Sequence, residues 1–284
     1  MTTINKTGLF SLLLLGLSAC GVDDEGAIDR NSFDPGRGIA AEAASGRTML
    51  RTPHGDLEVG YDVVGGRAIM EGDIDLGTVT EQGAIAGLRQ IDGSTSHSNT
   101  NLIFGAQWPS STIFYAKPSF NVSAIVDAVN DISAKTHVKF VQLPGVIPGL
   151  AMIQFTLSFD PDVSSSPVGY QGGVQSIQIW PTHGKSVVEH EVLHALGMWH
   201  EQQRIDRDIF INLNLGCVPI NRWHNFDKAG LPIGAYDFSS IMHYDSFAFS
   251  FIPGCATMTK KNGDTFSRSQ ALSTGDIASL NILY

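Results

Sequence analysis

The amino-acid sequence predicts a mixed α+β fold, in which helices and strands share one domain that follows an extended N-terminal region. Of its 284 residues, 43% are hydrophobic and 16% are charged, which is typical of a folded domain of medium size with extensions. Apolar residues alternate in several short segments, as in strands, and one longer segment has the helical period. A strand–helix–strand order implies a right-handed crossover and a partly parallel sheet.

The regular elements are expected from about residue 98 onward. Strands are indicated by short apolar or alternating runs at residues 113–115, 138–143, 152–157 and 175–180. The segment after the first strand repeats its apolar residues as an amphipathic helix does, at Val122, Ile125, Val126, Val129 and Ile132. A second helix is expected over residues 186–196. Together these elements predict a compact α/β unit over residues 98–284.

The first 19 residues have the pattern of an export signal. Lys6 precedes an apolar run that ends at Leu17 and is too short to span a bilayer comfortably. The run leads into Leu17-Ser18-Ala19-Cys20, which resembles the lipobox of bacterial lipoproteins. We therefore expect an exported precursor that is anchored to the membrane through an acylated Cys20. The alternative is an ordinary signal peptide that is cut near Ala19.

Three further boundaries follow from composition. Residues 20–45 are rich in Asp, Gly and Ala with little apolar periodicity, and are predicted to form a tether. Residues 46–97 form a separate segment with strand-like pieces, such as residues 57–64, which end at a Gly-Gly pair. The polar run over residues 92–101 is an expected linker and processing point.

The motif over residues 190–200 points to a metal site. His190 and His194 are four residues apart, so both imidazoles project from one face of a helix toward one ion. Glu191 is rotated about 100° from His190, beside the metal but outside its ligands. Gly197 can end the helix, so that the chain turns and brings in His200 as a third ligand. The alternative, core histidines without a metal, has to account for three of the nine His residues at this spacing.

This arrangement predicts hydrolysis that is assisted by one zinc ion. Three neutral histidines leave one position on zinc open, and the water bound there is acidified. Glu191 is expected to take a proton from that water as it attacks a peptide carbonyl, and to pass the proton to the leaving amine. No covalent intermediate forms.

The extended motif H-E-x-x-H-x-x-G-x-x-H is that of the metzincins, with Met242 as the structural Met-turn beneath the metal. The segments at residues 200–208, 240–244 and 272–277 further resemble the astacin family. The resemblance implies a twisted mixed sheet over two helices, with a zinc cleft between an N-terminal and a C-terminal lobe. It also implies an endopeptidase that acts on extended polypeptides.

The resemblance assigns further roles residue by residue. Tyr244 matches the tyrosine that ligates zinc at rest and hydrogen-bonds the developing oxyanion, although composition alone would make it a core aromatic. Glu201 matches the glutamate that binds the new N-terminus after processing, and is otherwise an ordinary exposed acid. The strand at residues 175–180 resembles the edge strand that aligns substrate. Many family members prefer an acidic residue after the cut, through a basic side chain, with Lys260, Lys261 and Arg268 as the candidates here.

The resemblance also implies latency. Family pro-segments carry Phe-x-Gly-Asp, whose aspartate replaces the catalytic water, and this chain has Met70-Glu71-Gly72-Asp73. We therefore expect residues 46–97 to inhibit the enzyme, with Asp73 as the latency ligand; the alternative is a plain Gly-Asp turn. Because Cys20 lies on the pro-segment side, a cut in the linker would release the catalytic domain from the membrane.

The cysteines depart from the family pattern. His137 occupies one family cysteine position, so neither of the two usual disulfides can form. The pair Cys217 and Cys255 is predicted to form a disulfide in an oxidising compartment, with two buried free thiols as the alternative. A zinc site at this pair is disfavoured, because neither cysteine sits in a C-x-x-C spacing.

Composition and motif weigh against other functions. The net charge of −10, without a cluster of Lys and Arg, argues against nucleic acid as a partner. A zinc-containing surface-binding protein or toxin with incidental or lost proteolysis is the main alternative, and the complete set of catalytic residues counts against it. A hydrolase of cell-wall peptides is disfavoured, because pairing with an edge strand suits extended chains of L-residues.

Overall fold

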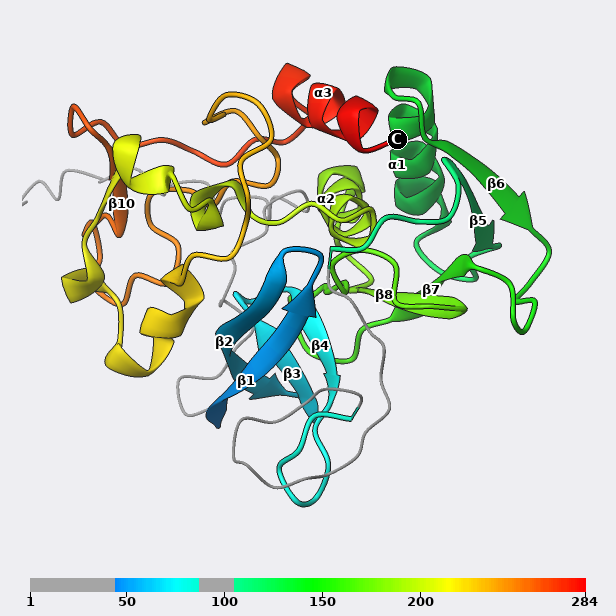
Figure 1. The fold of residues 1–284 in the computed structure, drawn as a ribbon, viewed down its shortest axis with the longest axis horizontal. Coiled ribbons are helices and arrows are strands. Elements are labelled where there is room, and N and C mark those ends of the chain that lie inside the picture. Colours follow the sequence, from blue (N-terminus) through cyan, green and yellow to red (C-terminus); the bar gives the residue numbers. More distant parts are fainter. Residues whose placement is uncertain (1–43, 87–104) are drawn as a thin grey trace, which may run out of the picture.

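The computed structural model describes residues 44–86 and 105–284 (Figure 1). The expected signal peptide, Cys20, nearly all of the tether and the expected processing region at residues 92–101 lie outside the described residues. Within the described part of the chain, no helix is long and apolar enough to cross a membrane.

A four-stranded parallel sheet forms the N-terminal part of the domain after residue 105. The strand order is β6-β5-β7-β8, and the strands are β5 (Thr112–Ala116), β6 (Lys139–Leu143), β7 (Met152–Leu157) and β8 (Val174–Ile179). An isolated antiparallel bridge joins Ser165 to Gln178 on the outer side of β8, so the sheet is mixed at that edge. All four strands were expected from the sequence.

Two helices cover this sheet, and a third closes the chain (Figure 1). Helix α1 (Val122–Lys135) buries Ile125, Val129 and Ile132, as its periodicity predicts, and it packs on α2 (Lys185–Ala195). Apart from Lys185, every residue of α2 is buried, because the helix lies at the centre of the domain. Its sequence therefore lacks the alternation of apolar and polar faces that marks a surface helix. Helix α3 (Thr274–Leu283) follows its N-cap residue Ser273, whose hydroxyl accepts a hydrogen bond from the backbone N–H of Asp276.

The C-terminal half contains mostly short elements. These are the 3₁₀ turns η1 (Glu201–Gln203), η2 (Arg207–Ile209), η3 (Leu215–Cys217) and η4 (Ile220–Phe226), and the two-stranded pair of β9 (Ile211–Leu213) and β10 (Met258–Lys260). Their separate apolar core includes Ile211, Phe226, Tyr244 and Met258. Helix α2 lies between this half and the parallel sheet, in agreement with the expected two lobes (Figure 1).

A separate antiparallel sheet precedes the domain, and we call it the N-terminal sheet. Its strands pair in sequence order: β1 (Ser45–Thr52), β2 (Gly55–Val64), β3 (Arg67–Met70) and β4 (Ile74–Thr78). The turn between β2 and β3 is Gly65-Gly66, and both residues have positive φ (54° and 78°), as a tight hairpin requires. The strand and break expected near residues 57–66 are therefore confirmed.

The N-terminal sheet packs against the rest of the molecule through apolar and charged contacts. Its core, which includes Leu50, Met70 and Ile74, also contains Val168 and contacts Trp199. The buried carboxylate of Asp62 forms an ion pair with Arg222 of η4 and lies 3.4 Å from His224 Nε2. Arg47 and Asp227 add an exposed ion pair at 3.2 Å. The sheet thus contacts both halves of the domain.

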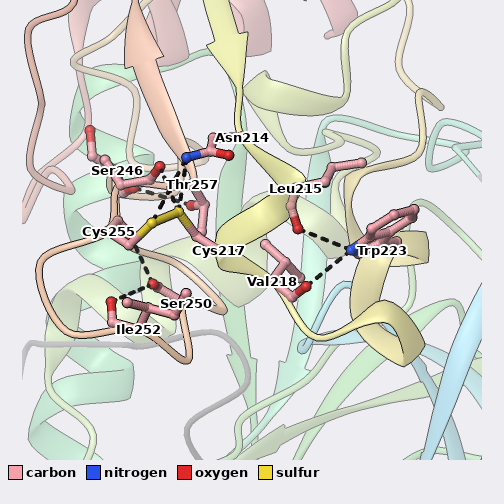
Figure 2. The surroundings of a disulfide bond; sticks show 11 residues. Asn214, Leu215, Cys217, Val218, Trp223, Ser246, Ser250, Ile252, Cys255 and Thr257 are labelled. Carbon is pink, nitrogen blue, oxygen red and sulfur yellow. Dashed lines mark hydrogen bonds between the residues drawn. A yellow bond between two sulfur atoms is a disulfide. The ribbon is translucent and has the colours of Figure 1, made fainter.

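Cys217 and Cys255 form a disulfide bond, as predicted (Figure 2). The bond joins η3 to the loop before β10, and Asn214 Nδ2 lies 3.0 Å from Cys217 Sγ. Phe251 N donates to Cys217 O at 3.0 Å, which adds a backbone contact between the same two segments. The disulfide therefore fastens a region that has little regular secondary structure.

Replacing both Cys217 and Cys255 with Ser should lower the free energy of unfolding by about 3–4 kcal/mol, because the bond closes a loop with a sequence separation of 38. Urea denaturation of the oxidised protein measures the change. Addition of a reductant to the wild type should have the same effect, and addition to the double variant should have none. Identical urea midpoints for wild type and variant would show that the bond adds no stability.

Candidate metal centre

The three histidines of the motif converge on one point. Helix α2 presents His190 and His194, the chain turns at Gly197 with φ 104°, and His200 follows. The Nε2 atom of His194 lies 3.1 Å from that of His190 and 3.2 Å from that of His200, and the other two are 3.3 Å apart. All three rings are buried. Three nitrogens facing one another this closely are arranged as the ligands of one cation are.

The other ring nitrogens set the tautomers. His190 Nδ1 lies 2.8 Å from Ile241 O, and His194 Nδ1 lies 2.8 Å from Met198 O. Because a carbonyl oxygen only accepts, each Nδ1 carries the proton and each Nε2 keeps its lone pair for a metal. Burial lowers the pKa of His190 to about 3 and that of His200 to about 4, so both rings are neutral near pH 7.

Asp73 of the N-terminal sheet reaches the same point. Its Oδ2 lies 3.1 Å from Nε2 of both His190 and His200, and the side chain is fully buried. One oxygen of Asp73 and one nitrogen of each histidine all lie within 4.8 Å of one another, so the four could hold a metal ion. Burial acts to raise the pKa of Asp73, but the three histidines hold it well below the usual range.

Glu71 also contacts this centre, and the sequence analysis assigned it no role. Its Oε2 lies 2.8 Å from His200 Nδ1, and its other oxygen accepts from Gln203 Nε2. Burial, followed by repulsion from Asp73, raises the pKa of Glu71 well above its usual value. The neighbouring Gly-Asp pair is the only signal in the sequence that could have drawn attention to Glu71.

Glu191 is buried and directly follows the first histidine of the centre. Among the described residues, no group hydrogen-bonds to either of its carboxylate oxygens. Burial and the charge of Asp73 raise its pKa well above the usual value, and the positive charge of Arg268 acts to lower it. A buried carboxylate with a raised pKa is suited to accept a proton.

Tyr244 lies beside the centre, outside the set of four ligands. Its ring centroid is 4.7 Å from that of His200, and its hydroxyl donates to the backbone oxygen of Glu71. Met242 is buried next to Ile241, whose carbonyl binds His190, and Met242 O accepts from Glu201 N at 3.0 Å. The Tyr244 hydroxyl is thus directed at the N-terminal sheet, and the expected ligand role of Tyr244 stays a prediction.

Glu201 is mostly buried, and it is not an ordinary exposed acid. Its Oε1 accepts from Arg204 Nη1 at 2.9 Å and from Asp237 N at 2.8 Å. Burial raises its pKa to about 7. Glu201 also lines a small cavity of about 50 Å³, together with Met198, Gly230 and Ser279.

The substrate-aligning edge expected at residues 175–180 needs a correction. Ser165 covers the outer side of β8, because Ser165 and Gln178 exchange two backbone hydrogen bonds of 2.9 Å. The outermost backbone is therefore the segment at residues 163–168, which we call the edge segment. Ser166 N donates to Asp73 O and Ser166 O accepts from Asp75 N, each at 3.0 Å, in a parallel pairing with the N-terminal sheet. The sequence of β8 gave no sign of this neighbouring segment, because residues 163–168 do not themselves alternate between apolar and polar side chains.

The three basic residues that could recognise an acidic substrate side chain have different surroundings. Lys260 Nζ lies 5.0 Å from the ring centroid of Phe238, and Lys261 Nζ donates to Asn212 at 3.0 Å. Arg268 alone interacts electrostatically with Asp73 and Glu191, and burial lowers its pKa to about 10.

Comparisons with known proteins agree with this geometry. The family model described as Astacin, a peptidase family, matches residues 103–284. Flavastacin from Elizabethkingia meningoseptica is 37% identical over 193 residues, which are 62% of this chain and 42% of flavastacin. Zinc metalloproteinase nas-36 from Haemonchus contortus is 31% identical over 245 residues, which are 76% of this chain and 38% of that protein.

A solved structure is also similar. High choriolytic enzyme 1, a hatching enzyme zinc-protease from the medaka Oryzias latipes, matches with a TM-score of 0.55 and 28% identity, over 64% of this chain and 94% of that one. The chain spans about two-fifths of the two curated relatives named above. Three histidines and one aspartate suit the zinc ion that these proteins are named for. Since the matched region contains all three histidines and well over half of the residues, the chain belongs to the astacin family of zinc metallopeptidases.

Proposed function

We propose that this protein is a zinc-dependent endopeptidase that hydrolyses extended polypeptides and is made as a latent precursor. The observation that carries the proposal is the convergence of three imidazole Nε2 atoms beside a buried carboxylate that no described group hydrogen-bonds. A centre of this kind suits hydrolysis, because the metal and the base act at the same place.

The residues divide the work of hydrolysis. His190, His194 and His200 would hold the zinc, which when bound polarises a peptide carbonyl and acidifies a water. Glu191 takes the proton of the attacking water and passes it to the leaving amine. The hydroxyl of Tyr244, once released from the Glu71 carbonyl, donates to the oxygen on which negative charge develops. Met242 would form the structural Met-turn beneath the metal, as the metzincin motif implies.

Latency rests on Asp73. Its carboxylate lies at the point where the three Nε2 atoms converge, so it competes with the water for the metal. The N-terminal sheet has a second anchor, the ion pair of the buried Asp62 with Arg222. Processing between the two units would allow the N-terminal sheet to dissociate from both contacts. It would also create a new N-terminus, whose ammonium group Glu201 would bind at the small cavity beside it.

Membrane attachment before processing would come from Cys20. The lipobox-like sequence lies on the same side of the expected cut as the N-terminal sheet. A cut near residues 92–104, followed by dissociation of the N-terminal sheet, would therefore both activate the catalytic domain and detach it from the membrane. The names of two similar proteins, zinc metalloproteinase nas-36 and the hatching enzyme zinc-protease, support the assignment to proteolysis.

Substitution of Glu191 by Gln in the processed protein should lower kcat by about 10²–10⁴-fold, because it removes the proton acceptor and leaves the ligands in place. Casein and a peptide library are suitable substrates, with a chelator as a second control. Glu189→Gln is a matched variant on the same helix and should change activity only slightly. If the wild type loaded with zinc cuts nothing, a zinc-containing surface-binding protein becomes the better assignment.

Substitution of Asp73 by Ala should make the full-length chain active, or make it degrade itself, before any processing. The change removes the carboxylate that occupies the metal centre, whereas Asp56→Ala changes an exposed carboxylate of the same sheet and should leave the precursor silent. Cleavage of a fluorogenic peptide by the uncut chain measures the effect. A precursor with the Asp73 change that stays silent would refute this role.

Arg268 is proposed to favour an acidic side chain after the scissile bond, because it is the basic candidate that interacts with Glu191 and Asp73. Arg268→Gln should lower the ratio of kcat/KM for Asp over Ala at that position by about tenfold, equivalent to about 1.4 kcal/mol. Lys261→Gln is the matched control and should leave the ratio unchanged. An unchanged ratio in the Arg268 variant with normal zinc content would exclude the assignment.

A further inference from the structure

A buried hydrogen bond joins two side chains that lie apart from the metal centre. Ser164 Oγ lies 2.7 Å from His183 Nδ1, and both residues are buried. The same hydroxyl oxygen accepts from Trp180 N at 3.0 Å. The hydrogen of that hydroxyl can therefore be given to His183, whose Nδ1 then acts as the acceptor.

The two residues belong to different structural units. Ser164 is part of the edge segment, which contacts β8 through Ser165. His183 lies in the turn between β8 and α2, where its N donates to Trp180 O at 3.0 Å. Asn121, just before α1, donates to His183 O at 2.8 Å. The hydrogen bond thus connects the outermost backbone to the turn from which the zinc-binding helix begins.

The edge segment is fixed at its other end as well. Gly169 N donates to His194 O at 2.8 Å, so that end is attached to the zinc-binding helix itself. Between the two attachments, Ser166 directs its N and O to Asp73 and Asp75 of the N-terminal sheet. When that sheet leaves, the same two backbone groups become available to an extended peptide.

The charge state of His183 suits a fixed hydrogen bond. Burial lowers its pKa to about 4, with Asp162 acting to raise the pKa and Arg268 to lower it. The ring is therefore neutral over the range in which a peptidase of this type would work, and its Nδ1 can accept the hydrogen bond from Ser164.

We propose that Ser164 and His183 are positioning residues, whose hydrogen bond holds the edge segment where it pairs with a polypeptide substrate. The inference rests on the proposed endopeptidase function and adds a role to residues outside the metal centre. The pair acts on binding rather than on the chemical step, because neither side chain belongs to the metal cluster.

The test compares Ser164→Ala, His183→Ala and the double variant in the processed enzyme. Each single change should raise KM for a long peptide about tenfold and leave kcat within a factor of about three, because a lost hydrogen bond is worth up to about one power of ten. The double variant should be no worse than either single variant. His183→Asn, which offers an amide near the position of Nδ1, should recover part of the loss. Ser158→Ala removes a neighbouring buried hydroxyl and is the control.

A second measurement needs no catalysis. In the full-length precursor, hydrogen exchange of residues 163–168 should become faster in both single variants, while that of α2 stays unchanged. Unchanged KM together with unchanged exchange would overturn the inference, and so would an equal loss of zinc, kcat and stability. If no form of the protein cleaves peptides but the exchange still becomes faster, the proposed function fails and the link between Ser164 and the edge segment stands.

Discussion

Three imidazole nitrogens must face one point in a buried site, and much of the molecule serves that constraint. Neutral rings that all direct lone pairs at one another repel unless a cation or proton lies between them. The carbonyls of Ile241 and Met198 bind the Nδ1 atoms of the two helical histidines and so fix the orientation of both rings. The positive φ of Gly197 allows the turn that places the third ring beside them. The burial of almost all of α2 follows, because a helix that carries two ligands needs rigid support on every side.

Local signals in the sequence predicted the parts of the fold that depend on local contacts. The period of Ile125, Val129 and Ile132 gave α1, and the spacing of the histidines gave the metal cluster. The parallel strands were also recognisable one by one. The C-terminal half was not, because its short 3₁₀ turns and long loops have no period to detect.

Other features depend on contacts between residues far apart in the sequence. Glu71 meets His200 across 129 positions, and nothing near Glu71 indicates this partner. Asp62 and Arg222 are likewise far apart in the sequence, and no motif includes either residue of this ion pair. The outermost backbone of the sheet was not predicted, because Ser165 covers β8 with only one bridge, which is too little to leave an alternating pattern. The family motif singled out Asp73, which lies beside the three histidines, whereas a Gly-Asp pair alone would have predicted only a turn.

The N-terminal sheet and the metal cluster are connected by one chain, so the contacts between them are intramolecular and have a high effective concentration. Cutting this connection would turn an intramolecular contact into a bimolecular one, whose occupancy depends on how much protein is present. The buried contacts of Asp62 and Asp73 would then keep the severed sheet bound where the protein is concentrated. Under the proposed latency, dilution would free the metal centre, so the local concentration of the cut protein would control activity together with the cut itself.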